Sequence, residues 1–236
     1  PMARDPRRPR QRARPGSPWP WGAIAVGGMA TIVALGLVGS YAWSHLHRVK
    51  HDIITGCPVT GPVAVHAVLV DRSDLFTPVQ AQRLTQIIET AAQQSRVDER
   101  LDLYVLTDKG GAVMRPEVSL CRPPSDGNRL VENPERIHKA FVRKFLTPIQ
   151  TATAAIQLTR EAPESLIMDS IKAVCIGAFG PLDRDIKLSL TIASDMIENS
   201  SHLNQYKPYK IEEFLHGPKL STVLADCRRA EVRILY

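Results

Sequence analysis

The sequence lacks the motifs of the common hydrolases and of structural zinc sites. It contains no G-x-S-x-G turn for a serine nucleophile and no C-x-x-C pair for zinc. The phosphoaspartate pattern D-x-D-x-T is also incomplete, because Ser73 and Leu75 stand where its second Asp and its Thr would follow Asp71. We therefore expect a protein that is not an enzyme, with a phosphohydrolase that uses Asp71 as the less favoured alternative.

Positive and negative charges nearly cancel over most of the chain. The formal net charge is +6, but residues 1–20 contribute +5 and residues 45–51 contribute +2, which leaves −1 for residues 52–236. A nucleic-acid-binding domain needs a basic face against the phosphates, so nucleic acid is not an expected partner. With 44% hydrophobic and 23% charged residues, the chain is also too apolar to be a disordered tail.

Residues 21–43 form an uncharged, mostly apolar run. As a helix, 23 residues span about 34 Å, which exceeds the roughly 30 Å of a bilayer's hydrocarbon core. Tryptophans at positions 19, 21 and 43 lie where aromatic rings favour the membrane–water interface. We expect a single transmembrane helix here. The alternatives are a buried helix of a soluble protein and a signal peptide cleaved near Ser40-Tyr41-Ala42.

The basic residues suggest how the chain is oriented. Residues 1–20 form a Pro/Arg-rich tail, and only two basic residues follow the apolar run closely. Positive charge favours the cytoplasmic side, so we expect a cytoplasmic N-terminus in the inner membrane. Residues 44–61 would be a linker, and residues 62–236 a periplasmic domain of a bacterium. The arginines at positions 4–14 could also tether the tail to anionic lipid or to nucleic acid.

Beyond the linker, short apolar runs alternate with stretches of helical periodicity. The pattern predicts strands at residues 63–70, 101–107, 186–194 and 232–236, a short antiparallel edge strand at 112–121, and helices at 78–95, 133–158 (bent near Pro148), 165–179, 211–215 and 220–228. Such alternation predicts one α/β domain with a doubly wound, mostly parallel sheet and one antiparallel edge strand.

Acidic residues follow two of the predicted strands. Asp71 comes after the first strand and Asp195 after the fourth. In open parallel sheets, ligands bind beyond the carboxyl ends of the strands, where the strand order reverses. If these strands are neighbours, the two carboxylates and the nearby hydroxyls form an all-oxygen site suited to Mg²⁺, Mn²⁺ or Ca²⁺. Taken singly, each Asp could instead form a turn or cap a helix.

The order strand, Asp71-x-Ser73, helix, and much later strand-Ser194-Asp195 resembles the von Willebrand factor type A-like domain over residues 62–236. That family carries a metal-ion-dependent adhesion site with the motif D-x-S-x-S, a Thr from a middle loop and a late Asp. The resemblance implies metal ligands at Asp71, Ser73 and Asp195, with Ser165 as the candidate for the Thr position. Leu75 departs from the motif at its second Ser.

The resemblance implies a function in binding rather than in catalysis. Such a domain presents its cation to a carboxylate of a protein partner, so we expect a membrane-anchored, metal-dependent binding or assembly module. A metal-free interaction scaffold with a degenerate site is the alternative. The short basic tail, the apolar run and the segments CPVTGP, VDRSD, VSLC and SDMIENS also resemble an uncharacterised group of single-pass bacterial membrane proteins.

A long loop after the fourth strand offers further candidates for partner binding. Residues 196–210 follow Asp195 directly, and exposed aromatic side chains often anchor interfaces. The candidates are His202, Tyr206 and Tyr209 of this loop, together with Asp74 after the first strand. The loop's aromatic side chains could equally fold back onto the domain.

The four cysteines are an even number in a compartment that permits disulfides. Cys57 precedes the first strand and Cys121 ends the antiparallel edge strand, so both are expected at the amino-end rim of the sheet, close enough for a bond. Cys175 falls within an apolar helix, and we expect a buried free thiol there and at Cys227.

Overall fold

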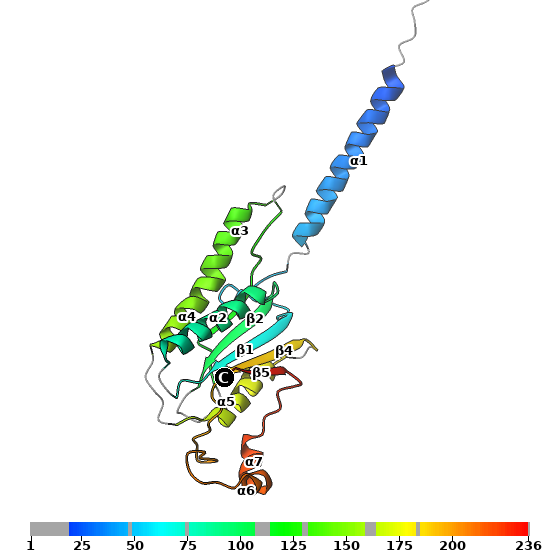
Figure 1. Cartoon of the computed structure of the whole chain (residues 1–236). Helices are drawn as coiled ribbons and strands as arrows, with labels where there is room; N and C mark the ends of the chain where they lie inside the picture. The colour runs from blue at the N-terminus through cyan, green and yellow to red at the C-terminus, as the bar shows by residue number, and fades with distance from the viewer. Residues whose placement is uncertain are drawn as a thin grey trace, which may run out of the picture. The chain divides into compact units, whose positions relative to one another are not determined.

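The computed structural model describes residues 19–46, 49–73, 76–106, 114–128, 132–158, 164–182 and 185–235. Its internal contacts divide the chain into two compact units, Pro1–Val49 and Lys50–Tyr236 (Figure 1). Almost all of the expected basic tail lies outside the described residues, as do Asp74 and Leu75.

The first unit contains one long helix, α1, at Trp19–Leu46. It extends the expected apolar run at both ends, and its 28 residues span about 42 Å. Thr31 and Ser40 donate their hydroxyl protons to backbone carbonyls of the same helix, so their polar groups are satisfied internally. Of the helices that the structure describes, α1 alone is long and apolar enough to cross a membrane, with a window at Val26–Trp43 of mean hydropathy 1.5.

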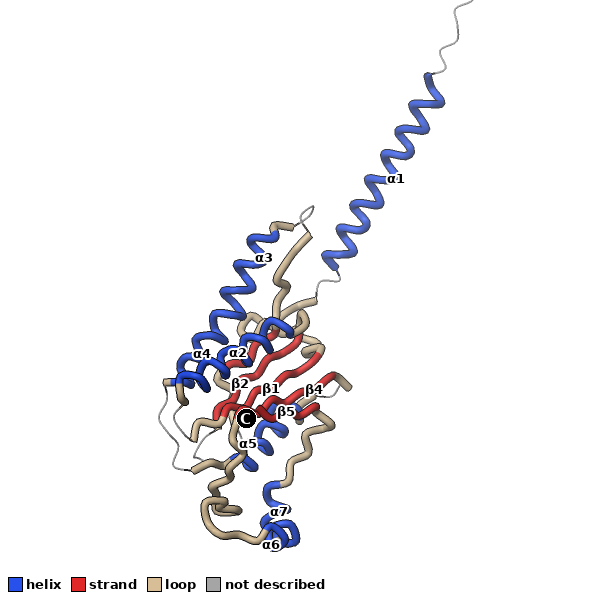
Figure 2. The backbone as a smooth tube through the Cα atoms, in the orientation of Figure 1, coloured by secondary structure: helices blue, strands red, loops and turns tan. Residues whose placement is uncertain are grey.

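The second unit is built on a five-stranded sheet, which confirms an α/β fold. The strands are β1 Ala64–Val70, β2 Glu99–Val105, β3 Val118–Cys121, β4 Lys187–Ala193 and β5 Glu231–Leu235. Their order is β3-β2-β1-β4-β5, and only the β2–β3 pair is antiparallel (Figure 2). After β1 the chain adds β2 and then β3 on one side of the sheet, and it then adds β4 and β5 on the other side of β1. The strand order therefore reverses between β1 and β4.

Helices cover both faces of the sheet. They are α2 Pro78–Gln94, α3 Pro134–Phe141, the π-helix η1 Val142–Leu146, α4 Thr147–Gln157, α5 Ile167–Val174, the π-helix η2 Cys175–Phe179, α6 Ile211–His216 and α7 Pro218–Val223. Side chains of α2, η1 and α4, including Phe145, pack on one face of the sheet. Side chains of α5 and η2, including Phe179, pack on the other. Two apolar layers therefore hold the sheet between them.

The long helix expected at residues 133–158 contains a π-turn where a bend was expected. Pro148 has no N–H to donate to a carbonyl four residues back, which removes one bond from the α-helical pattern. Directly before it, the Thr147 N–H donates to the Val142 carbonyl, five residues back. The wider turn lets the chain continue as a helix on both sides of the proline.

Two other predicted elements are shorter in the structure. The edge strand expected at 112–121 forms only over β3, and residues 107–113 lie outside the described residues. The helix expected at 220–228 ends at Val223, because the chain becomes extended at Leu224 and then turns through positive φ angles at Arg228 and Arg229 to enter β5.

A disulfide joins Cys57 to Cys121, the pair expected from the sequence. Cys121 lies opposite Arg100 at the start of β2, so the bond sits at the amino-end rim of the sheet. The Cys121 N–H also donates to the Thr55 carbonyl at 2.9 Å. The second half of the expected linker is thereby fixed to the edge strand.

The expectation of free thiols at Cys175 and Cys227 was wrong, because these cysteines form a second disulfide. Cys175 lies in η2, and Cys227 lies in the extended segment that precedes β5. Arg228 holds that segment against the end of η2 by donating to the carbonyls of Phe179 and Gly180. Because the segment is not helical, it can run beside η2 and bring the two sulfur atoms together.

Removing either disulfide should destabilise the domain. The bonds close loops of 64 and 52 residues, and constraining loops of that size in the unfolded chain is worth about 2–4 kcal/mol. We expect the double variant Cys175→Ala/Cys227→Ala to lose stability of this order in urea denaturation, with Cys57→Ala/Cys121→Ala as the matched comparison. Thiol titration of the denatured, unreduced chain should find no free thiol, and two reactive thiols would contradict the second bond.

Candidate functional site

Asp71 lies at the point where the strand order reverses. Val70 at the end of β1 pairs with Ala193 at the end of β4, and the Asp71 N–H donates to the Ala193 carbonyl at 2.9 Å. The next residues in this register are Asp71 and Ser194, so their side chains share one face of the sheet. The first and fourth predicted strands are therefore neighbours, which is the condition on which the expected site depended.

Three serines surround the Asp71 carboxylate, which is only 7% exposed. Its Oδ1 accepts from the Ser73 backbone N–H at 2.9 Å and from the Ser73 hydroxyl. Its Oδ2 accepts from Ser194 Oγ at 2.7 Å and from Ser165 Oγ at 3.4 Å. Ser73 Oγ and Ser165 Oγ are themselves 3.2 Å apart. We refer to Asp71, Ser73, Ser165 and Ser194 as the Asp71 cluster.

Ser165 reaches the cluster through a small backbone ladder. Its N–H and C=O both pair with Asn199, at 3.2 and 3.0 Å, in an isolated antiparallel bridge. Asn199 belongs to the loop that follows β4, so the end of β4 and the entry to α5 are tied together. Three segments far apart in the sequence thus supply the hydroxyls around one carboxylate.

Asp195 does not share this arrangement. Its side chain is exposed, and its Oδ1 accepts from the Ile197 N–H at 2.9 Å, which is a local turn. Within the described part of the chain, no hydrogen bond or ion pair joins Asp195 to the Asp71 cluster. Side chains alternate between the faces of a strand, so Ser194 rather than Asp195 points toward Asp71.

The donor atoms of the Asp71 cluster are all oxygen, the type that Mg²⁺, Mn²⁺ and Ca²⁺ prefer. One carboxylate and three hydroxyls fit a hard cation in kind, but they supply only one negative charge. Over the described residues, no group of three or more His, Cys, Asp or Glu side chains gathers at one place. A cation bound here would therefore rely on water or on a partner for most of its coordination.

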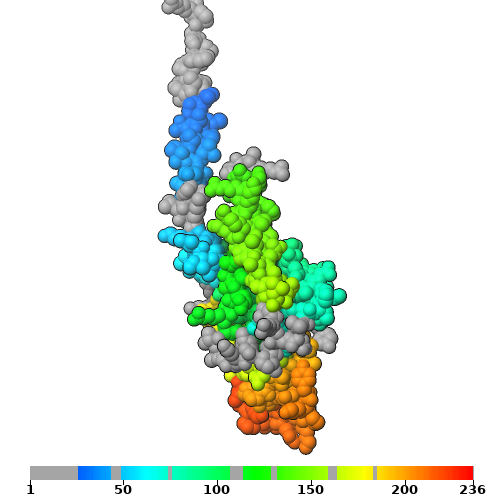
Figure 3. Space-filling model, turned by 90° about the vertical axis from the view of Figure 1, so that its left-hand side faces the viewer, coloured from blue at the N-terminus to red at the C-terminus, as the bar shows by residue number. Residues whose placement is uncertain are grey.

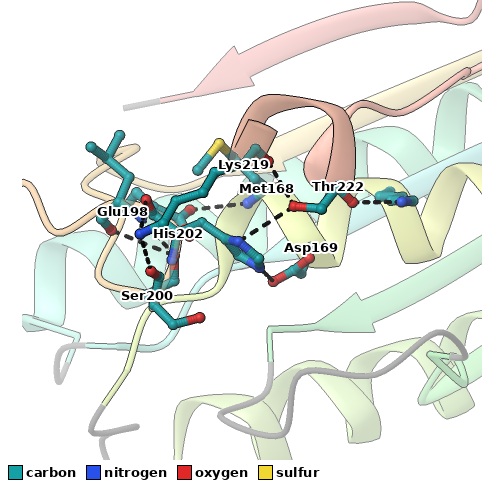
Figure 4. Close-up of polar contacts among 10 residues, drawn as sticks. Met168, Asp169, Glu198, Ser200, His202, Lys219 and Thr222 are labelled. Atoms are coloured by element: carbon teal, nitrogen blue, oxygen red, sulfur yellow. Dashed lines mark hydrogen bonds and ion pairs between the residues drawn. The ribbon is translucent and has the colours of Figure 1, made fainter. Parts of the chain in front are cut away.

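The loop at residues 196–210 folds against α5 through a buried glutamate. Glu198 is 3% exposed, and its Oε2 accepts from the Met168 N–H at 3.0 Å, which caps the first turn of α5 (Figure 4). Its Oε1 has no hydrogen-bond partner in the described structure. Burial raises the pKa of Glu198 above its ordinary value of 4.5, and the nearby hydrogen bonds oppose the rise without cancelling it.

The His202 ring also fixes this loop to the domain. It lies between Asp169 of α5, with Nε2 3.4 Å from Oδ2, and Thr222 of α7, with Nδ1 3.4 Å from Oγ1 (Figure 4). This order of side chains resembles a catalytic triad, but the Thr222 hydroxyl donates to the Lys219 carbonyl at 2.6 Å. The hydroxyl is thus also held by the backbone of α7, and the three side chains tie the loop to α5 and α7.

The candidates for partner binding separate into two groups. His202 turns inward, whereas Tyr206 and Tyr209 of the same loop are exposed. The loop as a whole is folded back, because the Glu198 N–H donates to the Gln205 side chain and Asn199 bridges to Asn204. Only the two tyrosines present large aromatic surfaces to solvent from it.

Sequence reasoning missed Ser194 and Glu198. Ser194 could have been found, because a parallel register that matches the end of β1 to the end of β4 places it beside Asp71. Glu198 carries no such signal, since its burial depends on how an irregular loop folds onto α5.

In comparisons with known proteins, no protein-family model and no curated protein sequence matches this chain.

Replacing Glu198 with Gln should change how stability depends on pH. Because burial raises the pKa of Glu198 in the folded state, the folded chain binds more protons than the unfolded chain above pH 4.5, and stability falls as pH rises. Glu198→Gln keeps the acceptor for Met168 and removes the buried charge. We expect the variant to be more stable than the wild type at pH 8.

Urea denaturation at several pH values tests this expectation. The difference between Glu198→Gln and the wild type should shrink toward pH 4.5, where the unfolded-state carboxyl also begins to protonate. Glu212→Gln, on the exposed side of α6, is the matched control. If Glu198→Gln raises the free energy of unfolding by the same amount at every pH, burial of the charge is not the cause of the difference.

Proposed function

We propose that this chain is a membrane-anchored module that binds another protein through a divalent cation at the Asp71 cluster. The observation that supports this proposal is the convergence of three serines on one buried carboxylate where the strand order reverses. Ligand sites of open parallel sheets lie at such reversals. The von Willebrand factor type A-like pattern of Asp71 and Ser73 agrees with the same function.

The ligand chemistry follows from the donor set. Asp71 would bind the cation directly, and Ser73, Ser165 and Ser194 would add neutral oxygen ligands. A cation held by one carboxylate keeps exchangeable water, which a carboxylate of the partner displaces to gain a charge-assisted contact. Tyr206 and Tyr209 lie on the loop that leaves this edge of the sheet and would extend the contact with the partner.

The anchoring and the location rest on α1 and on the cysteines. The apolar window of α1 is long enough for one membrane crossing, and the arginine-rich tail before α1 favours a cytoplasmic N-terminus. The second unit would then lie in the periplasm, attached to the inner membrane. Two disulfides in that unit agree with an oxidising compartment.

A metal-free interaction scaffold is the second candidate, and one observation favours it. Four hydrogen bonds from serine groups already satisfy both oxygens of Asp71, so a fold of this kind is stable without a cation. In that case the hydroxyls would lock the ends of β1 and β4 together, and the partner would recognise the surface alone.

Titration calorimetry with Mg²⁺ and Mn²⁺ on the full chain in mild detergent separates the two candidates. We expect binding by the wild type and none by Asp71→Asn, which loses the only charge of the cluster. Ser194→Ala should weaken binding, because it removes one neutral ligand and one hydrogen bond.

Asp195→Asn is the informative comparison, since it changes an exposed carboxylate one residue away. We expect it to weaken binding far less than Asp71→Asn does. A wild-type chain that binds neither cation would favour the metal-free scaffold. Hydrolysis of a phosphate ester that depends on Asp71 would instead favour the phosphohydrolase.

A further inference from the structure

The second unit begins with a rigid turn at its amino-end rim, which is the end of the sheet where β1, β2 and β4 start. The Asp52 carboxylate accepts from the N–H groups of Ile54 and Thr55, at 3.0 and 2.7 Å, and from the Thr55 hydroxyl. Gly56, at a φ of 69°, closes the turn by donating to the Asp52 carbonyl. The Cys57–Cys121 disulfide holds this turn against β3.

Two isoleucines stand at the tip of this turn, fully in solvent. Ile53 is 99% exposed and Ile54 is 85% exposed. Aliphatic side chains of this size favour burial, and here they are adjacent and held outward by a fixed backbone. An exposed apolar tip on a rigid support is typical of a surface that contacts another apolar phase.

Chain length limits how far this tip can lie from the end of α1. Ile53 follows Leu46, the last residue of α1, by seven residues, which reach at most about 25 Å when fully extended. The apolar window of α1 ends at Trp43. Whatever the angle between the two units, the chain therefore keeps Ile53 within about 30 Å of the end of that window.

A basic face lies on α3 and η1. Arg136, Lys139 and Arg143 are spaced three and four residues apart, so they share one side of the helix, and Lys144 follows. They line an open hollow of about 540 Å³ together with Glu135, whose carboxylate pairs with Lys139. The three other cations have no ion pair among the described residues.

This basic face projects toward the same rim as the isoleucines. Gln150 of α4 contacts Glu89 of α2 and Gln157 contacts Ala81, so the two helices run in opposite directions. Thirteen residues of helix, about 20 Å, precede Thr147, and they extend toward the end of α2 that lies at the amino-end rim. Figure 1 shows α3 reaching beyond the sheet on that side, and in Figure 3 the same helix projects from the second unit.

We propose that the amino-end rim of the second unit docks on an anionic phospholipid bilayer, with Ile53 and Ile54 inserted at the interface and the basic face of α3 and η1 against the lipid phosphates. An apolar tip combined with basic side chains is the pattern by which protein surfaces bind anionic membranes. This inference rests on the membrane anchoring proposed above, because the anchor keeps the rim and the lipid within reach of each other.

Docking would orient the candidate site. The strands β1 and β4 run from the amino-end rim to the Asp71 cluster, and the seven residues of β1 span about 23 Å. With the rim on the bilayer, the Asp71 cluster and the loop at residues 196–210 face away from the lipid, toward a partner in the aqueous phase.

Lysine footprinting of the full chain tests the docking. The chain is reconstituted in nanodiscs of phosphatidylcholine alone or mixed with phosphatidylglycerol, and a neutral acetylating reagent is applied. We expect Lys139 and Lys144 to react several-fold more slowly in the anionic nanodiscs, and more quickly again at high salt. Lys207 and Lys210, at the opposite edge of the domain, serve as internal controls whose rates should not change.

Variants separate the contribution of the isoleucines from that of the charges. Ile53→Ser/Ile54→Ser removes the apolar tip without changing the charge and should remove the protection of Lys139 and Lys144, whereas Val79→Ser, which changes an exposed aliphatic residue of α2, should leave it. Intact disulfides on non-reducing peptide maps show that each variant is folded.

Other outcomes overturn the proposal in distinguishable ways. Equal reaction rates in both lipids, in a chain that co-elutes with the nanodiscs, would overturn the docking alone. A chain that does not enter nanodiscs would overturn the anchoring and the docking together. Protection reproduced in detergent by inorganic phosphate would show binding of free phosphate, and protection that rises with protein concentration would show self-association.

Discussion

The pairing of β1 with β4 is the constraint on which the candidate site depends. The hydrogen bond from the Asp71 N–H to the Ala193 carbonyl extends this pairing one residue beyond the strands. It sets Asp71 beside Ser194 and leaves Asp195 exposed. A shift of the register by one residue would exchange these two neighbours and would place a second carboxylate next to the first. The composition of the cluster, one acid among hydroxyls, is thus a consequence of sheet geometry.

The two ends of the domain differ in chemistry because of how parallel strands are connected. All carboxyl ends of β1, β2, β4 and β5 lie at one edge, where the chain places small hydroxyl side chains and a long folded loop. At the opposite edge it places a tight turn, a disulfide and a projecting basic helix. The apolar layers on both faces of the sheet keep these ends apart. A site for a partner and a surface for the membrane can therefore occupy one small domain without overlap.

Much of this fold was predictable because it depends on local patterns. The apolar run of α1, the strands and the helices follow from hydrophobic periodicity, and the Cys57–Cys121 bond follows from where those strands end. The Cys175–Cys227 bond was not predictable in this way, because it depends on an irregular segment that was expected to be helical.

The candidate site also has a part that the sequence predicts and a part that it does not. The strand order predicts that Asp71 lies next to the end of β4. Which residue of β4's end lies beside it, Ser194 or Asp195, depends on the exact register of the two strands. The burial of Glu198 requires the fold of a loop with no periodic pattern.

The Cys57–Cys121 bond also decides how mechanical tension would travel through the molecule. A pull transmitted along the linker from α1 reaches its first covalent branch at Cys57. From there it divides between two covalent routes, one through residues 58–63 into β1 at the centre of the sheet and one through the sulfur atoms into β3 at its edge. The central strand therefore does not bear the whole load, and the polypeptide between the two cysteines cannot be drawn out toward α1. A partner held at the far edge would be pulled against the sheet as a unit.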